Sequence, residues 1–244
     1  MTPLIHFHRA PTAALLAQGL ADFVAQRLRA GVSERGQALL VVSGGSTPVP
    51  FFEALAQCDL DWSRVTITLA DERWVPEDHA DSNARLVKAH LLQGRAAQAS
   101  WVPLFKAEAT PQQGQAAIER KLAGLCWPAD VVVLGMGGDG HTASLFPHAS
   151  ELSVALAGVT GQRGHEPVPR CMAVAAPALP NVPVARLTLT ARALLDTRCL
   201  ALHITGSAKW ALLQSALQDG PIEQWPIRLA LQQGHVPCEV FHAD

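Results

Sequence analysis

The stretch Ala38-Leu-Leu-Val-Val-Ser-Gly-Gly-Ser-Thr-Pro48 decides the fold prediction. Residues 38–43 form a short, unbroken apolar run, which is typical of a strand covered on both faces of a sheet. A glycine-rich turn follows, and Pro48 to about Gln57 is predicted to be a helix with proline in its first turn. A strand that leads through a tight turn into a helix is the unit from which parallel α/β sheets are built.

The same alternation continues on both sides of this unit. It predicts an α/β fold with a mostly parallel, twisted sheet and helices on both of its faces. The predicted strands are Val65–Ala70, Asp130–Leu134, Cys171–Ala175, Arg186–Thr190 and Cys199–Thr205. The predicted helices are Thr12 to about Ala30, ended by Gly31, then Ser82–Leu92, Gln113–Leu125 and Ser207–Leu217, and the apolar segments Ile227–Leu231 and Cys238–Phe241 close the chain.

Length and composition indicate one folded domain. The chain has 244 residues, of which 49% are hydrophobic and 16% charged, so low-hydrophobicity disorder is excluded. The segments 157–170 and 176–185 are rich in Gly and Pro, but both are too short to link separate domains. We therefore expect a single domain over residues 1–244.

Charge and cysteine content restrict the partners and the compartment. Nineteen Lys and Arg against 21 Asp and Glu give a net charge of −2, which does not indicate nucleic-acid binding or a basic membrane patch. No signal peptide and no apolar run of about 18 residues is evident, so we expect a soluble, cytoplasmic protein without a membrane partner. The five cysteines are odd in number and widely spaced, which predicts buried free thiols.

Four polar clusters fall at the ends of predicted strands. Ligands of open α/β sheets bind at the carboxyl ends of the strands, so clusters that share this edge predict one site. They are Ser43–Thr47, Asp71–Arg73, Gly135–His141 and Gly206–Lys209.

The first cluster has the features of an anion site. Ser43, Gly44, Gly45, Ser46 and Thr47 combine two glycines, three hydroxyls and a helix N-terminus, where free N–H groups favour negative charge. It is not a Walker A loop, and the alternative is an ordinary glycine-rich turn.

The third cluster matches the letters of G-x-G-x-x-G, but its context does not fit a dinucleotide fold. Only six residues separate Gly140 from Pro147, which is too few for the helix of such a fold. The alternative is a loop that presents Asp139 beside His141. An imidazole next to a carboxylate suits general-base catalysis near neutral pH, although a single histidine is more often structural.

The remaining clusters supply positive charge. Arg73 is a candidate for stabilising developing negative charge, and Asp71 for holding Arg73 or a substrate hydroxyl, although such a triplet is normally a solvated turn. Lys209 is one of only four lysines and begins a helix, so it is a candidate phosphate contact rather than a plain surface lysine.

Other chemistries have weaker support. The sequence contains neither G-x-S-x-G nor H-E-x-x-H, which argues against a serine hydrolase and a zincin. His6 and His8 alternate on one strand face but have no third ligand nearby, so we expect no metal site.

Together these segments resemble the glucosamine-6-phosphate isomerase/6-phosphogluconolactonase family, whose fold is a modified Rossmann-like sheet related to ribose-5-phosphate isomerase. The most specific match is Leu134-Gly-Met-Gly-Gly-Asp-Gly-His-Thr-Ala-Ser-Leu-Phe-Pro147. The other matching stretches, in family order, are Val41–Pro48, Asp71–Val75 with Asp81-Ser-Asn83, Arg186–Thr190 and Gly206–Lys209.

The resemblance implies roles for these residues. His141 would activate water against a lactone carbonyl, Asp139 would support it, and Arg73 would stabilise the anionic centre. The 6-phosphate of a sugar-phosphate lactone would be held by Ser43–Thr47, Arg186 and Lys209. A δ-lactone needs little activation, so we expect no metal, no cofactor and no covalent nucleophile. We expect a monomer or a weak homo-oligomer.

Two alternatives remain open at this point. The first is a sugar-phosphate isomerase or deaminase, although deaminases of this group carry an acid in place of Phe146 and a tyrosine in place of Arg73. The second is a non-catalytic sugar-phosphate sensor, which would have no need of a base such as His141 beside Asp139.

Overall fold

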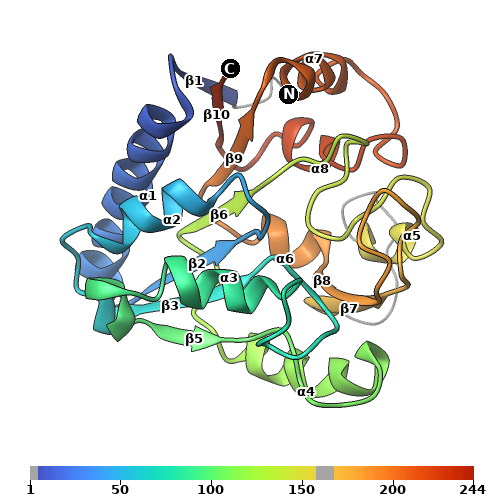
Figure 1. Ribbon diagram of the computed structural model, residues 1–244, viewed down its shortest axis with the longest axis horizontal. Coiled ribbons are helices and arrows are strands. Elements are labelled where there is room, and N and C mark those ends of the chain that lie inside the picture. Colours follow the sequence, from blue (N-terminus) through green and yellow to red (C-terminus); the bar gives the residue numbers. More distant parts are fainter. Residues whose placement is uncertain (1–4, 158–167) are drawn as a thin grey trace.

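A seven-stranded sheet forms the centre of the computed structural model, which describes residues 5–157 and 168–244 (Figure 1). All of its strand pairs are parallel, so the predicted mostly parallel sheet is confirmed. Most of the predicted loop 157–170 lies outside the described residues. In spatial order the strands are β1 (Ile5–Ala10), β10 (Cys238–Ala243), β9 (Leu200–Thr205), β6 (Val131–Leu134), β2 (Ala38–Val42), β3 (Val65–Leu69) and β5 (Ser100–Val102).

The central strands are apolar because both of their faces are covered. Every residue of β2 and β6 is buried, as the unbroken apolar runs in the sequence predicted. Four chain segments leave the carboxyl edge of the sheet after β2, β3, β6 and β9. Two of them lead into helices, α2 (Val49–Ala56) after β2 through the loop 43–48 and α7 (Ser207–Ala216) directly after β9.

A second sheet lies beside this edge and was not anticipated as a separate unit. It contains β4 (Asp71–Arg73), β8 (Arg186–Leu189) and β7 (Cys171–Val174), and its pairs are antiparallel. The predicted strands at 171–175 and 186–190 therefore do not join the parallel sheet. No helix lies between them, and without a crossover helix the chain returns beside itself in the antiparallel direction.

Helices cover both faces of the large sheet. On one face, α1 (Ala13–Arg35), α2 and α3 (Asn83–His90) pack together, with Phe241 of β10 against Phe23 of α1. On the other face, Trp210 of α7 stacks on His242, the next residue of β10. The remaining helices are α4 (Pro111–Ala123), α5 (Leu152–Ala155), α6 (Ala191–Leu195) and α8 (Arg228–Leu231), with 3₁₀ turns at Trp62–Arg64 and Gly94–Gln98.

The first helix is longer than predicted. It continues through Gly31 to Arg35 and ends at Gly36, which adopts the left-handed conformation with φ 74°. Gly31 serves a different purpose, because a Cβ there would lie 2.4 Å from Oδ1 of Asp130. The glycine permits close packing rather than ending the helix, so that prediction was wrong.

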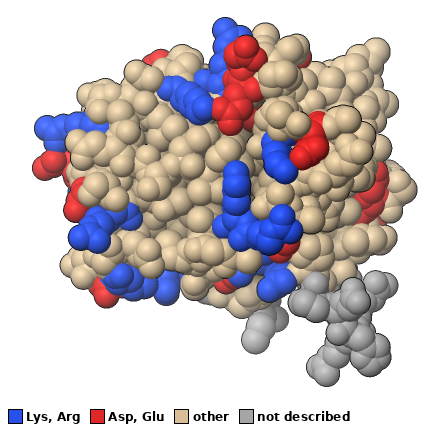
Figure 2. Space-filling model, turned by 90° about the horizontal axis from the view of Figure 1, so that it is seen from below, with Lys and Arg blue, Asp and Glu red and all other residues tan. Residues whose placement is uncertain are grey.

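The outer surface carries charges of both signs. In Figure 2, Lys and Arg side chains lie among Asp and Glu side chains, separated by wide uncharged areas. None of the helices described in residues 5–157 and 168–244 is long and apolar enough to cross a bilayer.

Candidate active site

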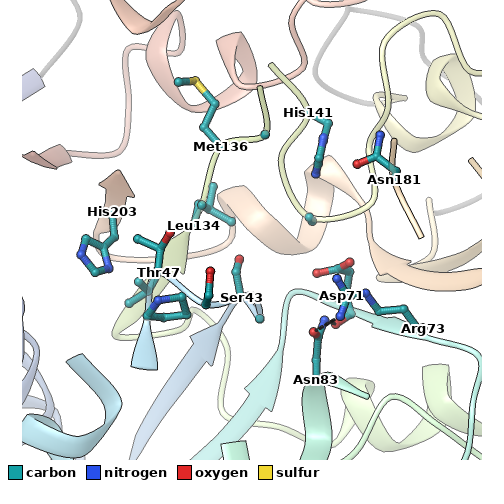
Figure 3. Close-up of a pocket in the computed structure, with 18 of the residues that line it drawn as sticks. Ser43, Thr47, Asp71, Arg73, Asn83, Leu134, Met136, His141, Asn181 and His203 are labelled. Atoms are coloured by element: carbon teal, nitrogen blue, oxygen red, sulfur yellow. Dashed lines mark hydrogen bonds between the residues drawn. The ribbon is translucent and has the colours of Figure 1, made fainter. Parts of the chain in front are cut away.

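A cavity of about 270 Å³ opens where the carboxyl edge of the large sheet meets the second sheet (Figure 3). Segments from five distant parts of the sequence line it. Figure 3 shows His203 and Thr47 on one side, Asp71, Arg73 and Asn83 on the opposite side, and Ser43 between them. His141 and Asn181 face the cavity from above in this view. The predicted site residues that line it are Ser43, Gly44, Gly45, Ser46, Thr47, Asp71, Arg73, His141, Arg186 and Lys209.

The loop between β2 and α2 forms one wall. A Cβ on Gly44 would lie 1.9 Å from Oδ1 of Asn83, and Gly45 has φ 102°, so both positions require glycine. The Ser43 hydroxyl is buried and has no partner among the described residues. The N-terminus of α2 has no side-chain cap, and the positive end of its helix dipole faces this wall. Of its first-turn N–H groups, Val49 donates to the Ser46 carbonyl and Pro50 has none, so Phe51 is the donor left for an anion.

His141 and Asp139 form a hydrogen-bonded pair. Nδ1 of His141 lies 2.5 Å from Oδ1 of Asp139, and the same oxygen accepts the backbone N–H of His141 at 3.1 Å. With Nδ1–H donated to the carboxylate, the neutral imidazole keeps its lone pair on Nε2, where it can accept a proton. Asp139 does not line the cavity itself but lies behind the ring that does.

A second contact reinforces the ionised state of Asp139. Its Oδ2 accepts a hydrogen bond from Nδ2 of Asn181 at 3.3 Å. Burial alone would raise the pKa of Asp139, but the hydrogen bonds and charge of His141, together with Asn181, lower it to about 2. The carboxylate is therefore an anion at neutral pH and favours the Nδ1–H tautomer of the imidazole.

Two glycines allow the loop that carries this pair to fold. A Cβ on Gly137 would lie 2.1 Å from Nδ1 of His141, inside the space that the ring needs. Gly140 adopts φ 82° and packs against Trp225, where a Cβ would come within 2.7 Å. Phe146 fixes the ring from another side, with its centroid 4.8 Å from that of His141.

Asp71 belongs to a buried polar group on the β4–β8 side. Its Oδ2 accepts the hydroxyl of Ser144 at 2.5 Å and lies 3.7 Å from Nη1 of Arg186. Arg186 is 3% exposed and stands opposite Arg73 in the β4–β8 register. The predicted phosphate residue Arg186 therefore lies close to the Asp71 carboxylate.

Arg73 is held by other partners than Asp71. Its Nη1 donates to the Asp81 carbonyl at 2.9 Å and to Oδ1 of Asn83 at 2.8 Å. Beneath it, the Glu72 carboxylate accepts the backbone N–H groups of Arg73 and Asn83, each at 2.8 Å. Of the two roles considered for Asp71, the contact with Arg73 is not formed, and Oδ1 of Asp71 has no side-chain hydrogen bond among the described residues that would exclude a substrate hydroxyl.

Lys209 lies in the first turn of α7, whose N-terminus at Gly206 also has no side-chain cap. Burial lowers the pKa of Lys209. Its positive charge acts on His203, and both residues line the cavity. Positive charge thus reaches the cavity from two sides, from Lys209 and from the two arginines.

Sequence reasoning missed three polar side chains of the cavity. Asn83 was quoted in the matching motif but received no role, Asn181 falls in a segment noted only for its Gly and Pro content, and His203 lies in a predicted strand. The only available signal for His203 was a histidine within the otherwise apolar run Cys199–Ile204. No group of three or more potential metal ligands of the His, Cys, Asp or Glu type occurs among the described residues.

Comparison with known proteins identifies the family. A family model described as glucosamine-6-phosphate isomerases/6-phosphogluconolactonase matches residues 11–238. The chain belongs to this family. Members with curated names include a 6-phosphogluconolactonase of Pseudomonas aeruginosa, 47% identical over 91% of this chain and 89% of that protein, and one of Rhizobium meliloti, 43% identical over the full length of both.

The solved structures of the family agree with this fold. A 6-phosphogluconolactonase structure from Shewanella baltica superposes with a TM-score of 0.90 at 40% identity, covering 100% of this chain and 98% of that one. The fold predicted from the alternating strands and helices, and the family implied by the matching motifs, are therefore both confirmed.

Proposed function

We propose that this protein hydrolyses 6-phospho-D-glucono-1,5-lactone to 6-phosphogluconate, a reaction of the pentose phosphate pathway. The relatives from Pseudomonas aeruginosa and Rhizobium meliloti are both named 6-phosphogluconolactonase. The observation that carries the proposal is the His141–Asp139 pair at the wall of a cavity lined by Arg73, Arg186 and Lys209.

The phosphate of the substrate needs a cationic binding site and its lactone carbon needs a base, and the cavity contains residues suited to each. We assign the phosphate to the Ser43–Thr47 loop and Lys209, where two uncapped helix N-termini add to the positive charge. Arg186 keeps an unpartnered Nε among the described residues and adds a third group for the phosphate. Binding there orients the lactone ring, so C1 lies toward His141 and Arg73.

The chemistry follows from the tautomer of His141. Its Nε2 takes a proton from water while the water oxygen bonds to C1, which leaves a negative charge on the former carbonyl oxygen. Arg73, fixed by Asp81 and Asn83, stabilises that charge. The C1–O5 bond then breaks, O5 receives the proton from the imidazolium, and the new carboxylic acid loses its own proton to solvent. Asp139 stays ionised throughout and stabilises the imidazolium.

Phe146 argues against a deaminase or isomerase. It is 7% exposed, lies 4.8 Å from the His141 ring, and its centroid is 5.2 Å from Cζ of Arg186. An apolar ring therefore occupies the place beside the base where a second acid would be needed. A non-catalytic sensor would not require the Asp139–His141 pair.

Acid release from freshly prepared 6-phosphogluconolactone, followed in a pH-stat and corrected for spontaneous hydrolysis, tests the proposal. We expect rapid, saturable release with the purified protein and no ammonia from glucosamine 6-phosphate. Ammonia release, or hydrolysis no faster than the spontaneous rate, would contradict it.

A further inference from the structure

A buried histidine on β9 has no assigned role in this reaction. His203 is 4% exposed, yet neither of its ring nitrogens has a hydrogen-bond partner among the described residues. Buried polar atoms in native proteins are nearly always paired, so two unpaired nitrogens on one ring require an explanation. Because His203 also lines the cavity, a bound ligand is a natural partner.

The surroundings of the ring indicate which ligand. Phe51 of α2 meets it edge-on, with centroids 6.2 Å apart, so the ring lies under the first turn of that helix. Figure 3 shows it beside Thr47 and away from the side of Asp71 and Arg73. Ser43 adds a third buried polar atom without a partner to the same cavity, and Lys209 adds its charge. These neighbours match an anion with several acceptor oxygens.

The ring is neutral in this position. Burial, with the positive charge of Lys209 as a second cause, lowers the pKa of His203 to about 4. A neutral imidazole carries one N–H donor and one lone pair. It can therefore offer a directed hydrogen bond to an anion without adding another positive charge beside Lys209 and the helix N-termini.

We propose that His203 is a substrate-binding residue that donates an N–H hydrogen bond to the phosphate group of the substrate, next to Lys209. The inference rests on the proposed function for the identity of the phosphate ester. It differs from that proposal in assigning part of the selectivity for phosphorylated over plain lactone to a residue of the sheet itself. His203 does not touch the reacting carbon, so it should affect substrate binding far more than turnover.

Matched variants separate this role from a structural one. His203→Leu removes both nitrogens, His203→Gln keeps a donor of similar reach, and His242→Leu changes a buried histidine on the opposite face of the sheet, outside the cavity. For each we would measure the Kd of 6-phosphogluconate by calorimetry, and kcat and KM on phosphorylated and plain gluconolactone.

We expect His203→Leu to weaken 6-phosphogluconate binding by roughly tenfold or more, the effect of losing one hydrogen bond to a charged group. Its kcat should stay close to that of the wild type, and its kcat/KM on plain gluconolactone should not change. His203→Gln should recover most of the affinity, and His242→Leu should bind like the wild type. Equal losses on both lactones, or unchanged product affinity in His203→Leu, would overturn the assignment.

A measurement on the unmodified protein covers the case in which His203→Leu fails to fold. With ¹⁵N-labelled histidine, adding inorganic phosphate should shift the resonance of the protonated nitrogen of His203, and an unshifted resonance would refute the contact. If phosphate binding depends on His203 but the wild type lacks lactonase activity, the proposed function fails and this site stands. If the wild type is active and His203→Leu binds 6-phosphogluconate normally, the proposed function stands and the assignment of His203 fails.

Discussion

The proposed reactivity of His141 depends on the different partners of its two ring nitrogens. Asp139 occupies Nδ1 at 2.5 Å, and Nε2 remains for the proton of water. Asn181 contributes indirectly. Its hydrogen bond to Asp139 fixes the orientation of the carboxylate, and the carboxylate in turn fixes the His141 ring. A general base supported in this way depends on neighbours that never touch the substrate.

Replacing His141 with Asn should remove the base and retain a polar side chain of similar size. We expect kcat on the phosphorylated lactone to fall by about 10²–10⁴, the usual contribution of general-base catalysis, while the Kd of 6-phosphogluconate changes little. Steady-state kinetics and calorimetry test both quantities, with His90→Asn on α3 as a control outside the cavity. A variant that kept most of its kcat would exclude His141 as the base.

Lys209 tests the phosphate end. Lys209→Ala loses a charge-assisted contact worth about 1.5–3 kcal/mol, which corresponds to roughly 10- to 150-fold in kcat/KM on the phosphorylated lactone. Plain gluconolactone has no anion at this position, so its kcat/KM should be nearly unchanged. Comparable losses on both substrates would place Lys209 at the reacting carbon or in folding instead.

In the loop between β6 and α5, the absence of a side chain at Gly137 leaves the space that the His141 ring occupies. Gly137 leaves room for the His141 ring, whereas a Cβ on the adjacent Gly138 would meet nothing within 4 Å. Gly137→Ala should therefore displace the imidazole and lower kcat on the order of 10²-fold, as displacements of about 1 Å commonly do. Gly138→Ala is the matched control and should stay within a few-fold of wild-type kcat. Similar kinetics in the two variants would contradict the steric argument.

Two helices offer the same comparison for stability. Gly114 of α4 faces Trp74, and a Cβ there would lie 2.3 Å from Cη2 of an indole fixed by its hydrogen bond to the Glu108 carbonyl. Gly114→Ala should lower the free energy of unfolding by about 1–3 kcal/mol through overpacking. Gly19→Ala in α1 meets nothing within 4 Å and should raise it by roughly 0.5–1 kcal/mol. Urea unfolding measures both, and a rise in the free energy of unfolding for Gly114→Ala as well would show that helix propensity outweighs packing there.

The elements that depend on local pattern could be predicted from the sequence, and those that depend on distant contacts could not. The unit 38–57 was predictable because its apolar run, glycines and proline are adjacent. Gly31 misled the prediction because its reason for being glycine is Asp130, 99 residues later. The β4–β8 pairing was likewise invisible, since Asp71–Arg73 has the sequence of a turn and becomes a strand only through its partner.

For the candidate site too, the features set by local sequence were predictable and those set by distant contacts were not. Placing the polar clusters at one edge of the sheet required only strand ends, and ten of the eleven predicted residues do line the cavity. The contacts between the carboxylates and the arginines of the cavity could not be predicted from the sequence, because they depend on how the strands of the second sheet pair. His203 was missed for a related reason: a buried strand is expected to be apolar, and a single polar residue in it gives no direction.

At the scale of the molecule, the cavity joins segments from residue 43 to residue 209. A ligand that contacts all of them binds only the folded chain, so it should stabilise the whole fold. At 100 times its Kd, 6-phosphogluconate should add about 2.7 kcal/mol to the free energy of unfolding. For a chain of this length that raises Tm by roughly 5–10 °C. Calorimetry with gluconate at the same concentration serves as the control, and an equal shift with gluconate would argue against a phosphate contact.

The position of β1 at the edge of the large sheet has a consequence for how the protein is made. Its sole strand neighbour among the described residues is β10, so residues 5–10 pair with residues 238–243. At synthesis rates of about 5–20 residues per second, the ribosome finishes β10 roughly 12–47 seconds after β1. During that interval Ile5 and Phe7 have no strand to pair with, and β9, once made, pairs with β6 but lacks its second neighbour. The sheet is therefore completed only after translation has passed residue 243, and a ribosome that stalls between β9 and β10 holds a nascent chain in which β1 is unpaired and one edge of β9 is open.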